Sequence, residues 1–104
     1  MAAEPRPDDP TLASRIRVPE HVVYRDFAEE TIVLNLDNGT YHSLNDTAAR
    51  MLQVLTASES VGDAVGELTR EFEQPSDRIE RDVLELCRAL SERGLVEQHA
   101  GSSG

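Results

Sequence analysis

The hydrophobic residues of this 104-residue chain change their spacing at Asn45, and that change restricts the fold more than any other feature. Before Asn45, apolar residues alternate with polar ones, which is typical of half-buried strands. After Asn45, they recur every three or four positions, which is typical of amphipathic helices. Because strands come first and helices follow, the sequence predicts an α+β fold with a small sheet packed on helices.

Three runs of residues before Asn45 have the composition of strands. Residues 22–27 and 31–36 are rich in β-branched and aromatic side chains, and a short polar link joins them. The turn that follows contains Asn38-Gly39, a pair that tolerates positive φ and suits a tight hairpin. Residues 40–44 form the third run, so we expect an antiparallel meander. Alternation in the second run puts Ile32, Leu34 and Leu36 on one face and Thr31, Val33 and Asn35 on the other.

The first two helices are predicted between Asn45 and Pro75. The side chain of Asn45 can cap the first helix, which should end near Thr56, and Ser60 can cap the second. Gly62 and Gly66 weaken the second helix, because each glycine costs about 1 kcal/mol relative to alanine.

The third helix is expected to begin with a cap at Ser76, after the break at Pro75, and to reach about Arg93. Gly94 occupies the place of a left-handed residue at the helix end. The apolar arc of this helix is wider than one flank of a small core requires, so part of it could line a groove. The arc contains Ile79, Val83, Leu84, Leu86, Cys87, Ala89 and Leu90.

The composition argues against a nucleic-acid partner. The formal net charge is -10, and no residue is lysine. Strands followed by three helices also suit a winged-helix DNA-binding regulator, in which the third helix would read the major groove. Acidic residues outnumber arginines on that helix, whereas a DNA-reading helix needs net positive charge. The regulator therefore remains a disfavoured alternative.

Both ends of the chain are expected to lie outside the fold. Residues 1–17 are polar and rich in proline, which suits a disordered arm, and residues 98–104 suit a flexible tail. Residues 18–97 then form the folded domain. The sequence has no signal peptide, no membrane span and a single cysteine, so we expect a cytoplasmic protein without a membrane partner.

Nothing in the sequence predicts an enzyme. Cys87 lies in an apolar stripe, where a free cysteine behaves as a small hydrophobic residue. The three histidines are too scattered for a metal site, and no glycine-rich phosphate loop is present. We therefore expect no catalytic residue, no metal and no cofactor.

The third run is the most promising binding element. Strands at a sheet edge are usually protected by charge, proline or a bulge. This run has no proline and no charged residue apart from a protonated histidine, so its backbone could pair with an added peptide strand. It consists of Thr40, Tyr41, His42, Ser43 and Leu44. The alternative is that the third helix or the N-terminal arm covers this edge.

The order of these features resembles the PqqD-like family, also called RiPP recognition elements (RiPPs are ribosomally made, modified peptides). The resemblance spans residues 18–96. It rests on the Asn-Gly turn with Tyr41 beyond it, on the Leu44-Asn45-Asp46-Thr47-Ala48 junction, and on the pattern from Asp82-Val83 to Gly94-Leu95-Val96. It implies a winged-helix-like shape, with a three-stranded antiparallel meander followed by three helices.

The resemblance also implies a function. Family members bind the leader segment of a precursor peptide as an antiparallel strand beside the third strand, and present it to a separate modifying enzyme or leader peptidase. On this chain the backbone of residues 40–44 would pair with the leader. The side chains implied as helix contacts are Arg78, Asp82, Val83, Leu86, Cys87 and Leu90.

Two pathways fit such a free-standing module. The first is lasso-peptide biosynthesis with a separate leader peptidase, which we slightly favour. The second is delivery to a radical-SAM enzyme, as in pyrroloquinoline quinone biosynthesis. Many lasso-type relatives have tryptophan where this chain has His42. A scaffold subunit that pairs with its own copy through the same edge is a further alternative.

Overall fold

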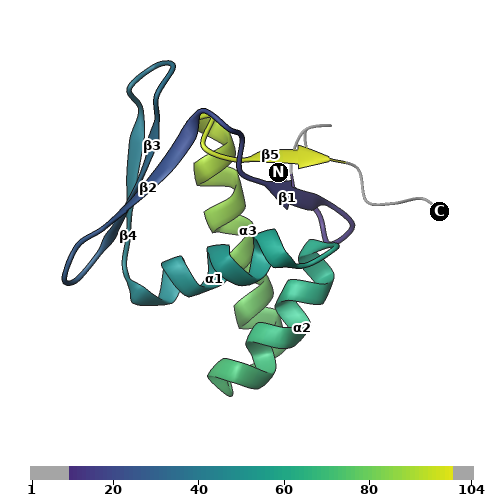
Figure 1. Cartoon of the computed structure of the whole chain (residues 1–104). Helices are drawn as coiled ribbons and strands as arrows, with labels where there is room; N and C mark the ends of the chain where they lie inside the picture. The colour runs from purple at the N-terminus through teal and green to yellow at the C-terminus, as the bar shows by residue number, and fades with distance from the viewer. Residues whose placement is uncertain (1–9, 100–104) are drawn as a thin grey trace, which may run out of the picture.

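The structure is a computed structural model in which residues 10–99 are described. It confirms the α+β prediction, with a three-stranded antiparallel sheet followed by three helices (Figure 1). In chain order the elements are β1 (Arg15–Arg17), β2 (Val22–Asp26), β3 (Thr31–Asn35), β4 (Tyr41–Leu44), α1 (Asp46–Ala57), α2 (Val61–Phe72), α3 (Ser76–Glu92) and β5 (Glu97–His99).

The main sheet has the strand order β2-β3-β4, with antiparallel pairing throughout. Its inner face packs on the helices, and Val33 and Asn35 on that face are 0% and 3% exposed. The opposite, apolar face of β3 points outward, and Leu36 just beyond it is 60% exposed. The buried face of β3 is therefore the one that carries Thr31, Val33 and Asn35.

The three helices form the core together with that inner face. Helix α2 packs against both α1 and α3, and its buried residues include Leu68. Leu52 and Leu55 of α1 and Val83 and Leu90 of α3 complete the centre of the core. Within the described part of the chain, no helix has the length and apolar character needed to cross a bilayer.

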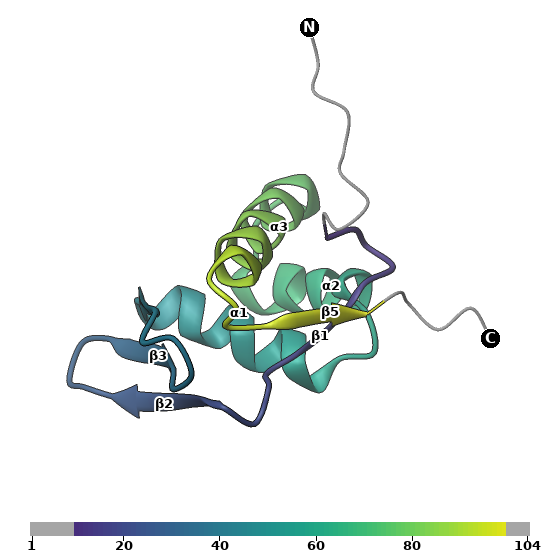
Figure 2. The same ribbon diagram turned by 90° about the horizontal axis from the view of Figure 1, so that it is seen from above.

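The structure differs from the sequence prediction at both ends of the domain. Residues 15–17, assigned to the arm, form β1, and β5 includes residues 98 and 99 of the expected tail. The two strands pair antiparallel, with Arg15 opposite His99 (Figures 1 and 2). Ile16 is 2% exposed, and its burial gives this short pair an anchor in the core. Residues 1–9 and 100–104 of the predicted arm and tail lie outside the described residues.

The segment before β1 closes the start of α2. The backbone N–H groups of Val61 and Gly62 donate to the carbonyls of Ser14 and Leu12, at 2.8 and 2.9 Å. The first turn of a helix leaves such N–H groups without partners, so the segment satisfies two of them. A Cβ atom at Gly62 would lie 3.3 Å from the Leu12 oxygen. Gly62 weakens the helix, but because it has no Cβ it permits the Leu12 carbonyl to approach α2 closely.

The helix ends follow the predictions with one exception. Asn45 and Ser60 cap α1 and α2 through their side chains, as expected. Gly94 has the predicted positive φ, at 69°. Ser76 is not the cap of α3, because Pro75 holds the extended backbone that precedes the helix and Ser76 is already helical. No side chain caps α3.

Candidate peptide-binding site

Strand β4 is an edge of the main sheet, since the strand order ends with it. The Asn35 N–H donates to the Thr40 carbonyl at 2.8 Å, which fixes the hydrogen-bonding register of the hairpin. In antiparallel pairing, consecutive residues alternate between bonding inward and pointing outward. Thr40, His42 and Leu44 therefore direct their backbone groups to β3, and those of Tyr41 and Ser43 point away from the sheet.

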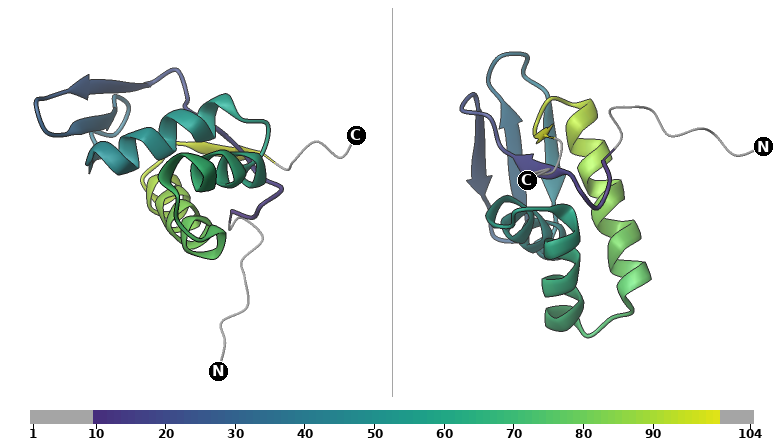
Figure 3. Two further views of the ribbon diagram at one scale, coloured as in Figure 1. Left: turned by 90° about the horizontal axis from the view of Figure 1, so that it is seen from below. Right: turned by 90° about the vertical axis from the view of Figure 1, so that its right-hand side faces the viewer.

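Helix α3 runs beside the sheet, with its C-terminal end level with the β3–β4 turn (Figure 3). Arg93 follows this helix directly, and its Nη1 donates to the Tyr41 carbonyl at 3.1 Å. The guanidinium thus crosses from the helix end to the outward-pointing backbone of β4. Residues 39–43 and Arg93 surround an open depression of about 520 Å³.

His42 lies in the same depression and is half-buried, because its position on β4 faces the helices. Burial lowers its pKa below the ordinary 6.5, and the positive charge of Arg93 lowers that pKa further. Both effects disfavour the protonated ring. His42 is therefore neutral at pH 7, and Arg93 provides the positive charge of the depression.

Because Arg93 contacts β4, we expect the residues in line with it on α3 to be the ones nearest the depression. Residues three or four positions apart lie on one face of a helix. Asp82, Leu86 and Ala89 precede Arg93 at this spacing, so the four residues form one stripe, which we call the β4-side stripe. The first three are half-buried and Arg93 is exposed.

Three of the predicted helix contacts lie in the core. Val83, Cys87 and Leu90 are each 0% exposed, so their side chains offer no surface to a peptide in this conformation. Burial raises the pKa of the Cys87 thiol to about 12, which keeps it neutral and unreactive. Leu44 of β4 is also buried, at 1% exposure, and faces α1. Because its backbone groups point to β3, Leu44 offers neither its side chain nor its backbone to a peptide at the outer edge.

Of the three remaining predicted contacts, Leu86 is half-buried on the β4-side stripe. Arg78 and Asp82 line a second hollow of about 440 Å³ at the N-terminal end of α3. Thr47, Met51 and Phe72 lie across from them. Because Asp82 belongs to the β4-side stripe, this hollow and the depression at Arg93 lie at opposite ends of that stripe. The structure thus places both predicted polar contacts of α3 away from the depression at Arg93.

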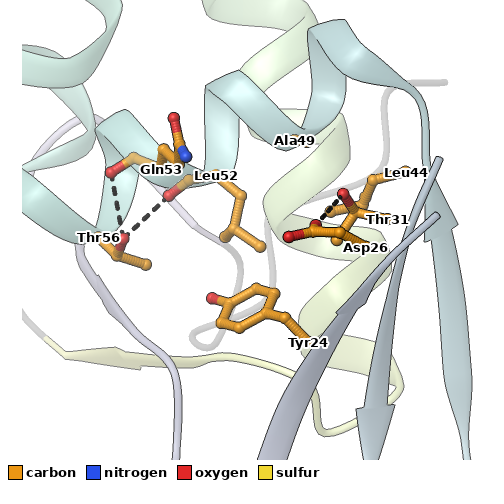
Figure 4. Close-up of a pocket in the computed structure, with 8 residues that line it drawn as sticks. All are labelled: Tyr24, Asp26, Thr31, Leu44, Ala49, Leu52, Gln53 and Thr56. Carbon is orange, nitrogen blue, oxygen red and sulfur yellow. Dashed lines mark hydrogen bonds between the residues drawn. The ribbon is translucent and has the colours of Figure 1, made fainter. Parts of the chain in front are cut away.

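The opposite edge of the sheet, β2, borders a smaller pocket of about 330 Å³ against α1 (Figure 4). Tyr24 and Asp26 line it, and Asp26 accepts a hydrogen bond from the Thr31 hydroxyl at 2.8 Å. Burial raises the pKa of Tyr24. The Tyr24 carbonyl accepts from Arg25, its neighbour in sequence, at 3.2 Å. This edge is thus charged, as predicted, whereas β4 carries no permanent charge.

Sequence reasoning missed two residues of the candidate site. Arg93 was expected only as the end of the third helix, although its spacing already put it in line with Asp82, Leu86 and Ala89. Asn35 was assigned to one face of its strand, but no hydrogen-bond partner was predicted for its side chain. No local sequence pattern indicates its bond to the Gly94 carbonyl. Across residues 10–99, no group of three histidine, cysteine, aspartate or glutamate residues is arranged to hold a metal ion.

An exposed, uncharged sheet edge is the kind of surface to which extended peptides add as further strands. The family model described as coenzyme PQQ synthesis protein D (PqqD) matches residues 30–96. This protein belongs to the PqqD family and is a PqqD-like RiPP recognition element.

Two solved structures resemble the chain over nearly their whole length. One is described as TbiB1 in complex with the TbiA(beta) leader peptide, with 26% identity, a TM-score of 0.70, and coverage of 81% of this chain and 98% of that one. The other is a lasso peptide synthetase B1 complexed with the leader peptide, with 30% identity, a TM-score of 0.70, and coverage of 79% and 96%. No curated protein matches the chain.

Proposed function

We propose that this protein binds the leader segment of a ribosomally synthesised precursor peptide as an added strand along β4 and carries no catalytic role. The observation on which the proposal depends is the outward-pointing backbone of Tyr41 and Ser43 on an uncharged edge. The solved relatives support it, since both are described as complexes with leader peptides. Because precursors of this kind are made by ribosomes, we place the function in the cytoplasm.

The leader would run antiparallel to β4. Its N-terminal end would then lie near Leu44 and the start of α1, and its C-terminal end near Gly39 and Arg93. Each outward residue of β4 offers one N–H donor and one carbonyl acceptor, so Tyr41 and Ser43 can form four backbone hydrogen bonds. Each contributes about 0.5–1.5 kcal/mol net.

Side chains of the added strand would alternate between two environments. Residues opposite Tyr41 and Ser43 would share the outer face of the sheet. Residues opposite Thr40 and His42 would face α3, where Leu86 and Ala89 offer half-buried apolar surface. Apolar leader residues at the second set of positions would supply most of the affinity.

We further propose that the bound precursor is delivered to a separate leader peptidase of lasso-peptide biosynthesis. The likeness to a lasso peptide synthetase B1 supports this pathway over delivery to a radical-SAM enzyme. His42 in place of the tryptophan of many lasso-type relatives would give the leader a smaller, more polar contact. The neighbouring genes distinguish the two pathways. A peptidase gene beside this one would indicate the lasso pathway, and a radical-SAM gene would indicate the other pathway.

The proposal is tested by calorimetric titration with the precursor peptide encoded beside this gene. Ser43→Pro removes an outward N–H of β4 and should abolish binding, whereas Ser43→Ala retains it and should bind normally. Both variants lose the bond from the Ser43 hydroxyl to Glu30, so they differ at the backbone alone.

Asp26→Pro is the matched control at the other edge. The Phe27 N–H donates to Glu30, so the register turns the Asp26 backbone away from β3 and proline removes an outward N–H there too. We expect this variant to bind normally. If Asp26→Pro lost affinity and Ser43→Pro retained it, the leader would bind at β2.

Two other outcomes would support the alternative functions. Retention of duplex DNA by the protein at low salt would support a DNA-binding regulator. Self-association of the protein without affinity for the peptide would support a scaffold subunit.

A further inference from the structure

Arg93 binds a backbone carbonyl of the candidate site and not a carboxylate. Its guanidinium donates to the Tyr41 carbonyl, and within residues 10–99 it forms no ion pair with a carboxylate. Arg50, by contrast, binds the Glu71 carboxylate through two nitrogens at 2.7–3.1 Å. The chain has 20 acidic residues. Among residues 10–99, Arg93 is therefore a positive charge without a carboxylate partner.

The Tyr41 carbonyl is also one of the acceptors that an added strand requires. A peptide residue opposite Tyr41 would donate its N–H to the same oxygen that now accepts from the Arg93 Nη1. Strand addition therefore brings a competing donor to this oxygen, and in the proposed complex the guanidinium moves off it. The displaced cation remains at the depression beside His42, whose pKa is already lowered by burial and by this charge. A carboxylate from the peptide is the group that would stabilise Arg93 there.

We propose that Arg93 selects leader peptides that carry an aspartate or glutamate at one defined position. The inference rests on the proposed strand addition and adds the peptide class. The residue opposite Tyr41 points to the outer face, so its two neighbours point toward α3. In an antiparallel strand the neighbour on the C-terminal side lies opposite Thr40, at the end of β4 closest to Arg93. That neighbour is the acidic residue.

The neighbour on the N-terminal side lies opposite His42 and faces Leu86 and Ala89, so it is apolar. The recognised pattern is therefore an apolar residue, any residue, and then an acidic residue. An internal leader segment has no free terminus at this place, so the carboxylate comes from a side chain. Bidentate pairing with a guanidinium favours arginine over lysine at position 93.

The test is selection from a phage-displayed library of random peptides, about 12 residues long, on wild-type protein, Arg93→Gln, Arg93→Lys and Ser43→Pro. Wild type should enrich the apolar-x-acidic pattern, Arg93→Gln should lose the acidic preference, and Arg93→Lys should retain it in part. Synthetic versions of the best peptide, with Glu and with Gln at the acidic position, are then titrated against each variant. Arg93→Gln should weaken the Glu peptide by about tenfold or more.

The Gln peptide provides the sharper comparison. The Gln peptide should bind the Arg93→Gln variant at least as tightly as it binds the wild-type protein, because the variant has no guanidinium on the Tyr41 carbonyl. Equal enrichment of acidic residues by wild type and Arg93→Gln would overturn the inference, as would equal affinity of wild type for the two peptides. The second comparison uses wild-type protein alone, so it does not depend on whether a variant folds. If wild type enriches no peptide over Ser43→Pro, the proposed strand addition itself is wrong.

Discussion

The Nδ2 of Asn35 donates to the carbonyl of Gly94 at 3.0 Å, which joins the β3–β4 hairpin to the residue after α3. The Asn35 Oδ1 accepts from the N–H groups of Asp37 and Asn38, at 2.9 and 3.3 Å, and so also shapes the turn. One buried amide, 3% exposed, thus holds the start of β4 and the end of α3 at a fixed separation. That separation sets the position of Arg93 against Tyr41.

Replacement of Asn35 by leucine should lower the free energy of unfolding by about 2 kcal/mol, because buried backbone groups lose their partners. It should also weaken leader binding, since the hairpin is no longer fixed to α3. Urea denaturation measures the first effect, and titration at a temperature where the variant is folded measures the second. Asn38→Ala is the control: its side chain bonds only the exposed Thr40 N–H, so a loss as large as that of Asn35→Leu would contradict the assignment.

Two glycines of α2 should respond oppositely to alanine. Gly66→Ala should raise the free energy of unfolding by about 1 kcal/mol, because its Cβ would meet only the Arg70 guanidinium, at 3.8 Å. Gly62→Ala should lower it by about 1 kcal/mol, because its Cβ would crowd the Leu12 carbonyl, which the Gly62 N–H holds in place. Urea denaturation of the pair tests the contact. Equal stabilisation by both alanines would mean that residues 11–14 do not pack on α2.

The Cys87 thiol should react with an aromatic disulfide only as fast as the protein unfolds, since it is buried and its pKa is raised to about 12. Leader peptide should slow the reaction only by stabilising the fold.

The raised pKa of the Cys87 thiol also predicts how stability depends on pH. In the unfolded chain this thiol ionises near its ordinary pKa of 9.0, so the unfolded state loses the proton first as the pH rises. The free energy of unfolding should therefore fall as pH rises from about 9 to 12. Cys87→Val should reduce this slope.

The His42 ring should titrate below 6.5 in the folded protein. The unfolded chain then takes up the proton first as the pH falls. This residue therefore destabilises the fold as the pH falls from 6.5 through the folded-state pKa. Arg93→Gln should raise the pKa of His42 but leave it below 6.5, because burial, the larger cause, remains. NMR titration measures the shift, and Arg78→Gln at the other end of α3 should leave the pKa unchanged.

Local patterns predicted most of the fold because they depend on neighbours in sequence. The change of spacing at Asn45 separated sheet from helices, and the Asn-Gly turn fixed the hairpin that presents β4. Gly94 was recognised as a left-handed residue from its position alone. Ser76 was misjudged because serine is a favoured cap, whereas the fixed φ of Pro75 already provides the extended residue before α3.

Features that depend on long-range contacts could not be read from the sequence. The short segments at β1 and β5 have no strand pattern of their own, and they form strands because they meet each other beside the core. The sequence showed that the apolar arc on α3 is wide. It did not show which residues of the arc are buried in the core and which lie on the surface. Val83, Cys87 and Leu90 are buried in the core, and only the contact between Arg93 and Tyr41 shows which neighbouring stripe borders β4.

The β1–β5 pair has a consequence for engineering. Arg15 lies opposite His99, and both strands sit on the far side of the molecule from β4 (Figures 1 and 2). A catalytic domain fused beyond either strand would therefore leave the leader-binding edge unobstructed. The same closeness should permit circular permutation, with a linker from residue 99 to residue 10 that keeps residues 11–14 on α2, and with new termini in the exposed loop between β2 and β3.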